Sequence, residues 1–425
     1  PKPASPWPAA RWAGGGARLG EILRASPHHP AGTAGPSSLL GPAKDDWHAT
    51  LLDAAPGNVE EMDDMHREAI LHPGPVVIPA LAGLARQGLP AATVLDALVR
   101  GYEVMIRIGR SLGPHHYFHW HNTATAGAFG AAMACADALG LRDEQAVWAL
   151  GNAGTQAAGL WQVRLEPVMS KQLHTAHAAW AGRSAAMLAS HGFTGPQQIL
   201  EGPRGFFAAM CPDGNPAAVL QQTSNWQIHG TSFKPWPSCR HTHATIDCVL
   251  AIREAEGGPL PFTDCTVETF GDALSICNNP APRTRTEAKF SLQYCVAAAA
   301  RFGPLRPEHF DEANLSDPQL LAAAARVRLQ PAPDLNDLYP THYGARVMLD
   351  VAGRATRHAV ADSLGDPERP MSEAAILDKA QTLMAYGGVA ASRREAVQRA
   401  ARELLEAPPD LLLRPLPGAL LDPLF

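Results

Sequence analysis

Residues 125–140 read TAGAFGAAMACADALG, and this run sets the architecture of the first half of the chain. Gly127, Gly130, Ala134 and Ala138 carry so little side chain that neighbouring backbones can approach closely. The run is therefore predicted to be a buried central helix without chemistry of its own. Further helices, separated by Gly or Pro, are predicted at residues 76–86, 91–111, 143–160 and 171–191.

The pattern changes after Trp226. Runs rich in β-branched residues are typical of strands and lie at residues 266–270, 325–329, 345–351 and 354–360. The last two are joined at Ala352-Gly353 like a hairpin, and residues 319–325 read as a helix between strands. Helical periodicity returns over residues 372–405, so we expect the C-terminal part to rejoin the helical domain.

The predicted fold class is thus mainly α with an α+β part. We expect an N-terminal helical domain over residues 1–230 and a smaller α+β domain over residues 231–360. Residues 361–425 are expected to form a helical segment that returns to the helical domain.

Composition and charge exclude several classes of protein. The 425 residues carry 35 Lys and Arg against 41 Asp and Glu, so we expect no nucleic-acid partner. No apolar segment approaches the roughly 18 residues of a membrane helix, so we expect no membrane span. The seven cysteines are scattered without a CxxC pair, which argues against a disulfide framework, a zinc ribbon or an iron–sulfur cluster. A reducing cytoplasm is the expected compartment.

Residues 60–74, EEMDDMHREAILHPG, gather acids, two histidines and an arginine just before a predicted helix. A solvated charge run and a site loop both remain open as interpretations. Asp64 and His72 are the candidate site residues of this segment.

Residues 115–127, HHYFHWHNTATAG, place four histidines directly before the small-residue helix. At strand spacing, His119 and His121 would point to one side, which is a geometry suited to a metal. No HExxH motif or third carboxylate at fixed spacing accompanies them, so metal binding is not favoured.

Residues 169–182, MSKQLHTAHAAWAG, place Lys171 near the start of a helix, where the helix dipole does not support a cation. The lysine is either solvated or faces an anion, and the local sequence slightly favours solvation.

Residues 232–247, SFKPWPSCRHTHATID, gather Lys234, Arg240 and His243 around two prolines that hold the backbone extended. A rigid site loop leading into a helix is predicted, with an ordinary interdomain crossover as the alternative. Residues 285–297, RTEAKFSLQYCVA, put Tyr294 at a loop-to-helix junction, where a purely structural tyrosine is the alternative.

In this order, the motifs DDMHREAILHPG, HNTATAGAFGAA, MSKQLHTAHAAWAG, FKPWPSCRHTHATID and EAKFSLQY resemble the MmgE/PrpD superfamily, and the resemblance runs over residues 63–379. That superfamily contains 2-methylcitrate dehydratases, cis-aconitate decarboxylases and iminodisuccinate epimerases. The resemblance implies a helical domain built from both ends of the chain, an α+β lid domain and a homodimer. It also implies an active site in the cleft that needs no metal or organic cofactor.

The resemblance carries over residue by residue. His72 matches the family's HP histidine, His121 the histidine before the small-residue helix, and Lys171 the lysine of the M-x-K segment. Lys234 matches the K-x-x-P lysine, and Tyr294 the FS-x-Q-Y tyrosine.

We therefore assign His121, Lys171 and Tyr294 to catalysis. The expected substrate ligands are Asp64, His72, Lys234, Arg240 and His243.

The resemblance implies removal of a proton α to a carboxylate, which needs a placed base and cations for the developing charge, and this chain has residues for both. The leading hypothesis is a cofactor-independent lyase that dehydrates a 2-methylcitrate-like tricarboxylate. The closest alternative is an epimerase of an amino- or iminodicarboxylate. A non-catalytic carboxylate binder and a metal hydrolase using the histidines of residues 115–121 also remain open. Two departures count against decarboxylation: Cys239 stands where the family's decarboxylases carry histidine, and Met65 lies near the position of their threonine.

Overall fold

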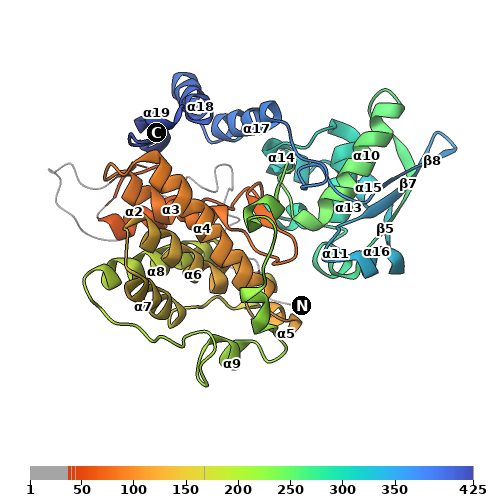
Figure 1. Ribbon diagram of the computed structural model, residues 1–425. Coiled ribbons are helices and arrows are strands. Elements are labelled where there is room, and N and C mark those ends of the chain that lie inside the picture. The colour runs from red at the N-terminus through yellow and green to blue at the C-terminus, as the bar shows by residue number, and fades with distance from the viewer. Residues whose placement is uncertain (1–36, 40, 44, 167, 425) are drawn as a thin grey trace, which may run out of the picture.

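The computed structural model describes residues 37–39, 41–43, 45–166 and 168–424. Its first domain is a helical bundle with α6 at the centre (Figure 1). The bundle consists of α3 (Gly74–Ala85), α4 (Ala91–Arg110), α6 (Asn122–Ala138), α7 (Asp143–Gly154) and α8 (Ser170–Ser190). Helix α6 packs against the other four and is buried on nearly every side, as predicted.

Glycines bring the axes of these helices close together. A Cβ on Gly130 of α6 would lie 2.5 Å from the Cβ of Met105 and 2.9 Å from the carbonyl oxygen of Gly101. A Cβ on Gly182 of α8 would lie 2.5 Å from the carbonyl oxygen of Ala128. Since real Cβ atoms do not approach other atoms so closely, both positions require glycine for this packing.

Shorter elements complete the N-terminal part. They are β1 (Ser37–Ser38), β2 (Gly41–Pro42), α2 (Asp46–Ala54), β3 (Asp64–His66), α5 (Pro114–His119), η1 (Trp161–Arg164), α9 (Phe206–Met210), η2 (Pro216–Leu220) and η3 (Gln227–Gly230). Strand β3 pairs antiparallel with β4 (Thr231–Phe233), with Met65 opposite Ser232. This two-stranded ribbon lies where the chain leaves the first domain.

The second domain is built on a four-stranded sheet of order β6-β5-β7-β8. The strands are β5 (Phe262–Thr269), β6 (Val327–Pro331), β7 (Ala345–Val351) and β8 (Arg354–Val360). Strand β6 is parallel to β5, whereas β7 is antiparallel to both β5 and β8. The β7–β8 hairpin turns at Ala352 (φ 54°) and Gly353 (φ 79°), as the sequence predicted.

Helices cover one face of this sheet (Figure 1). Helix α10 (His243–Ala255) packs on β7 and β8, and α13 (Leu292–Phe302) packs on β6 and α10. The remaining elements are η4 (Arg240–Thr242), α11 (Gly271–Ile276), α12 (Arg285–Lys289), η5 (Pro307–Phe310), α14 (Glu312–Leu315), α15 (Pro318–Ala324) and α16 (Pro333–Leu338).

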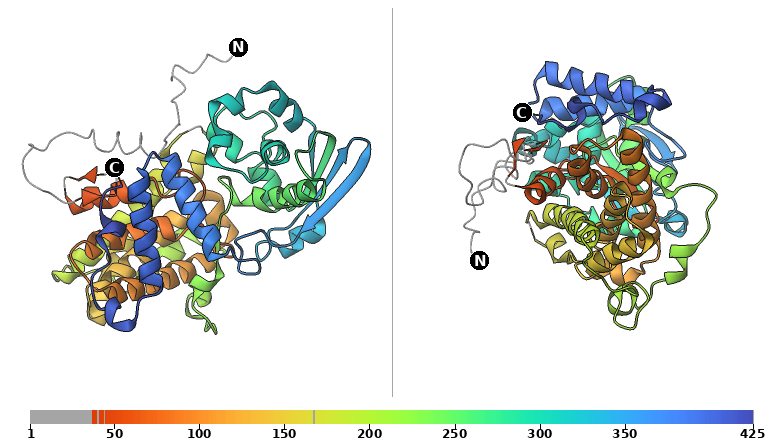
Figure 2. Two further views of the ribbon diagram at one scale, coloured as in Figure 1. Left: turned by 90° about the horizontal axis from the view of Figure 1, so that it is seen from above. Right: turned by 60° about the vertical axis from the view of Figure 1, so that its left-hand side comes forward.

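The C-terminal helices run back over the first domain (Figure 2). They are α17 (Glu373–Tyr386), α18 (Ala391–Leu405), α19 (Pro409–Leu412) and α20 (Gly418–Leu421). The backbone N–H of Ala91 donates to the carbonyl of Arg414, and Nε of Arg86 donates to the carbonyl of Leu421. Both ends of the chain therefore contribute to the helical domain.

The predicted fold class is confirmed, and the differences from the predicted elements are local. Helix α7 ends at Gly154 rather than near residue 160, and the chain then turns at Gly159 (φ 120°). The carbonyl of Gly159 then accepts a hydrogen bond from the backbone N–H of His121. Among the described residues, no helix combines the length and the apolar character needed to cross a bilayer.

Candidate active site

Two buried carboxylates stand at the centre of the site, on the segment between α2 and α3. Glu61 accepts from the ammonium groups of Lys171 and Lys234, the latter at 3.2 Å. Asp63 accepts from Lys234 at 2.9 Å. Nδ1 of His72 lies 2.8 Å from Oδ2 of Asp63. One acidic pair thus joins three predicted site residues that are far apart in the sequence.

The charges of this cluster fix its protonation. Burial alone would raise the pKa of Glu61, but Lys171 and Lys234 outweigh it and lower the pKa to about 2. Burial is likewise outweighed at Asp63, where His72 and Lys234 hold the pKa well below its usual range. Burial opposes the charge of Lys234, yet Asp63 and Glu61 raise its pKa above the ordinary value. Glu61, Asp63 and Lys234 are therefore ionised at neutral pH, so Lys234 is a cation rather than a base.

Accessibility separates the two lysines. The side chain of Lys234 is 0% exposed, whereas that of Lys171, at the start of α8, is 18% exposed. Lys171 can therefore meet a ligand, while Lys234 lies behind the carboxylates.

His121 precedes the first turn of α6, where the hydrogen bond to Gly159 holds its backbone. Its ring lies 4.3 Å from that of Trp161 and 5.5 Å from that of His174, measured between centroids. Nδ1 of His121 is buried and has no hydrogen-bond partner among the described residues. Burial, followed by the charges of Lys171 and other nearby bases, lowers the pKa of His121 well below its usual value. The imidazole is therefore neutral at pH 7 and has a nitrogen free to accept a proton.

The remaining predicted residues occupy different surroundings. Asp64 accepts from the hydroxyl of Tyr102 and the backbone N–H of Gly74, so it anchors the start of α3. Burial raises the pKa of Asp64. Arg240 forms a buried ion pair with Asp366, and Nε2 of His243 lies 3.1 Å from the carbonyl oxygen of Ser238. These groups support the entrance to the second domain.

Tyr294 does not join the cluster. Its ring is fully buried in the core of the second domain, and its hydroxyl donates to the carbonyl of His309 at 2.7 Å. This placement matches the structural alternative considered for this tyrosine.

The HxH pair does not form the expected geometry. Because Pro114–His119 is a short helix, His119 is exposed and packs against His115, whereas His121 is buried beside Trp161. The expectation that both imidazoles face one side is wrong.

Comparison with known proteins identifies the family of the chain. The MmgE/PrpD N-terminal domain matches residues 18–219, and the MmgE/PrpD C-terminal domain matches residues 236–406. The chain belongs to the MmgE/PrpD family. The family boundaries fall on either side of β4, close to the boundary near residue 230 that we propose between the domains.

Similar members of this MmgE/PrpD family are cis-aconitate decarboxylases. The human enzyme is 28% identical over 306 residues, which cover 68% of this chain and 62% of the human one. The mouse enzyme is 26% identical over 318 residues, which cover 70% of this chain and 63% of the mouse one. The Aspergillus terreus enzyme is 29% identical over 226 residues, covering 49% and 45%. The matched region thus spans less than two thirds of each relative's length.

The two departures from the MmgE/PrpD decarboxylase pattern lie in one place. Met65 and Cys239 are buried in the same small apolar cluster, together with Phe270, Leu292 and Tyr343. All seven cysteines, Cys239 included, are free and buried. An apolar wall therefore occupies the positions at which the resemblance leads us to expect a threonine and a histidine.

Sequence reasoning missed Lys379, which α17 brings to the site of this family member from the C-terminal segment. Burial lowers the pKa of Lys379 to about 8, although the charges of Asp63 and Asp64 oppose this. The gap of more than three hundred residues between Lys379 and these carboxylates leaves no local signal that they lie near one another.

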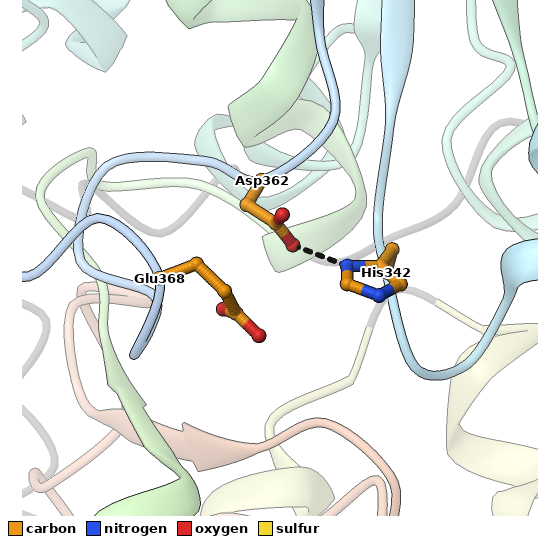
Figure 3. Close-up of side chains that lie close together, drawn as sticks. All are labelled: His342, Asp362 and Glu368. Carbon is orange, nitrogen blue, oxygen red and sulfur yellow. Dashed lines mark hydrogen bonds and ion pairs between the residues drawn. The ribbon is translucent and has the colours of Figure 1, made fainter.

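One group of described side chains has a spacing that could hold a metal ion, namely His342, Asp362 and Glu368 (Figure 3). Arg67 already donates to Asp362 at 2.9 Å and to Glu368 at 2.7 Å. A metal ion there would compete with a guanidinium for the same oxygens, so the group is better suited to joining the domains than to catalysis.

Proposed function

We propose that this protein is a cofactor-independent lyase that removes a proton α to a carboxylate of a small di- or tricarboxylate, as in the dehydration of 2-methylcitrate. The observation that carries the proposal is the neutral, unpartnered imidazole of His121 beside the accessible ammonium of Lys171. A buried neutral base next to a fixed cation suits the formation of an enediolate. Family membership supports the same general chemistry.

In the proposed reaction, the imidazole of His121 takes the proton, and the electron pair of the C–H bond moves toward the adjacent carboxylate. Lys171 stabilises that charge, and His72 binds a carboxylate oxygen. The electron pair then forms the C=C bond as the β-hydroxyl leaves. The leaving hydroxyl takes a proton from Lys171 and departs as water. Transfer of the proton from His121 back to Lys171 through solvent restores the enzyme.

Lys234, Glu61 and Asp63 act through Lys171 and His72 in this proposal. The ammonium of Lys234 is enclosed by Glu61 and Asp63, and it neutralises both carboxylates. The pair Glu61 and Asp63 then orients Lys171 and His72 toward the ligand. These three are positioning residues.

Decarboxylation is the second candidate, because the similar relatives are cis-aconitate decarboxylases. There the C–C bond to a carboxylate would break, and the carbanion would take a proton from an acid. The apolar surroundings of Met65 and Cys239 favour the first candidate, since they replace polar groups of the decarboxylase pattern.

Proton NMR in D2O with 2-methylcitrate and cis-aconitate as separate substrates tests the proposal. Loss of the methine proton signal of 2-methylcitrate, with its methyl doublet replaced by the downfield singlet of a methyl group on an alkene carbon, supports dehydration. Carbon dioxide release from cis-aconitate would instead support decarboxylation. Deuterium incorporation without an alkene would mean an epimerase, and binding without exchange would mean a carboxylate-binding protein; each would overturn the lyase.

We also propose a homodimer in the cytoplasm, as the resemblance and the cysteine pattern lead us to expect. Light scattering during gel filtration measures the assembly directly. A mass of one chain would reject the dimer.

A further inference from the structure

Arg164 lies near the site, and its guanidinium forms no ion pair with a carboxylate of the described residues. It ends η1, between α7 and α8, and within the described part of the chain no acid pairs with it. Its guanidinium lies 5.0 Å from the ring centre of Trp161 and 5.7 Å from that of Tyr117. Two aromatic faces thus hold an exposed arginine in a defined position.

Most neighbouring cations are neutralised by the protein itself. Lys171 and Lys234 bind Glu61, and Arg240 binds Asp366. Lys289 binds Glu60. Arg164 differs from these cations because no protein carboxylate pairs with it in the described residues, so its charge is available to a further carboxylate of a polycarboxylate.

Arg164 lies near residues of both domains. Its charge contributes to the lowered pKa of His121, in the helical domain, and of His241, in the second domain. Trp161 connects it to the reaction centre, because the indole ring contacts both His121, at 4.3 Å, and the guanidinium of Arg164, at 5.0 Å. Only the indole side chain therefore separates Arg164 from the imidazole of His121.

Two buried ring nitrogens on neighbours of His121 also lack partners. Within the described residues, no group accepts from Nε1 of Trp161, and Nδ1 of His174 is likewise unpartnered. Buried polar atoms are nearly always hydrogen-bonded in native proteins, so such atoms along one wall indicate a missing polar ligand.

We propose that Arg164, with the indole N–H of Trp161, binds the substrate carboxylate that takes no part in the reaction, and so selects tricarboxylates over dicarboxylates. This inference rests on the proposed function, because it concerns the same cleft. The planar guanidinium can grip both oxygens of that carboxylate while His121 reaches the α carbon. Arg164 is thus the specificity-determining residue of the site.

Two unreactive acids test this assignment: propane-1,2,3-tricarboxylate, and glutarate, which lacks the central carboxylate. Titration calorimetry measures their binding to wild type and to Arg164→Gln, Arg164→Lys and Trp161→Phe. Arg164→Gln should weaken tricarboxylate binding at least 10-fold but glutarate binding less than 3-fold, since a charge-assisted pair is lost only for the former. Arg164→Lys should weaken tricarboxylate binding by an intermediate amount, and Trp161→Phe should weaken it a few-fold.

Arg204→Gln is the matched control, because Arg204 is an exposed arginine outside the site. It should bind both acids as wild type does, and each variant should keep the wild-type thermal transition. Equal losses for both acids, or no loss with Arg164→Gln, would overturn the assignment, and so would a wild type that binds neither acid. Selective binding without exchange or alkene in D2O would reject the proposed function while supporting the role of Arg164.

Discussion

Glu61 shows how much the site demands of a single residue. It adopts a left-handed backbone conformation, φ 54°, which costs a non-glycine residue of order 1 kcal/mol or more. That conformation lets one carboxylate accept from both Lys171 and Lys234. The ion pairs offset the strain, so this residue type is needed for its charge and not for its backbone.

Lys234 tests the buried cluster. We expected from the sequence a residue that clamps a substrate carboxylate, but its ammonium is enclosed by Glu61 and Asp63. Lys234→Met should therefore lower the free energy of unfolding by about 3–5 kcal/mol, because it leaves buried carboxylates unpaired. Urea denaturation measures the loss. Adding Asp63→Asn should recover part of it, and a Lys234→Met variant of wild-type stability with only a raised KM would return Lys234 to substrate binding.

His121 should control the acid limb of the pH profile. A base must be unprotonated, and the lowered pKa of His121 keeps it so well below pH 6.5. We therefore expect protonation of His121 to cause no fall in kcat/KM between about pH 7.5 and 6. His121→Ala should lower kcat/KM about 100-fold or more. His119→Ala is the control, because that imidazole is exposed and outside the cluster. Similar losses in the two variants would remove His121 from the role of base.

Metal removal separates proton chemistry from metal chemistry. We expect full activity after exhaustive chelation, because His121 and Lys171 can perform the proposed step and Arg67 already binds Asp362 and Glu368. Activity assays with elemental analysis check this. Activity that is lost on chelation and restored by zinc or iron would contradict it.

At the scale of elements, α6 and α8 depend on glycine contacts. Gly182→Ala places a methyl group against Ala131 and 2.5 Å from the carbonyl oxygen of Ala128. We expect a loss of about 1–3 kcal/mol in the free energy of unfolding. Gly258→Ala is the control, because a Cβ there meets no atom within 4 Å. Equal denaturation midpoints for the two variants would show that the helices can move apart.

The sequence predicted the helices and the sheet better than it predicted the site. Helical periodicity and the content of small residues identified α6. Runs of β-branched residues identified β7 and β8. Both kinds of signal are local in the sequence. The two-residue strands and the pairing of β3 with β4 have no such signal. The ion pairs from Glu61 to Lys171 and Lys234 depend on how distant segments pack, so the residue types could be singled out but not their partners.

For the whole molecule, buried neutral histidines link stability to pH. Burial lowers the pKa of His66 and His241 to about 3 and that of His116 to about 4. Because the unfolded chain binds protons near pH 6.5, it gains more protons than the folded chain as the pH falls below that value. Each such histidine therefore costs about 1.4 kcal/mol per pH unit between its unfolded and folded pKa.

The thermal transition should accordingly fall steeply from pH 6.5 to 5. Scanning calorimetry measures this slope, and His66→Gln should reduce it by the share of one histidine. His358→Gln, at an exposed position on β8, should leave the slope unchanged. A transition temperature independent of pH over this range would contradict the linkage.

The chain enters and leaves the second domain at one place. The backbone N–H of Phe233 donates to the carbonyl of Gly365, and the hydroxyl of Ser232 donates to Asp366 at 2.5 Å. These two adjoining chain segments form a hinge, so any rotation of the second domain relative to the first would take place about an axis through them. Lys234 lies at this hinge and would move little during such a rotation, whereas the tip of the β7–β8 hairpin lies far from it and would move farthest. A spectroscopic label on that hairpin, paired with one on α8, would therefore report opening of the cleft far more sensitively than a label beside Lys234.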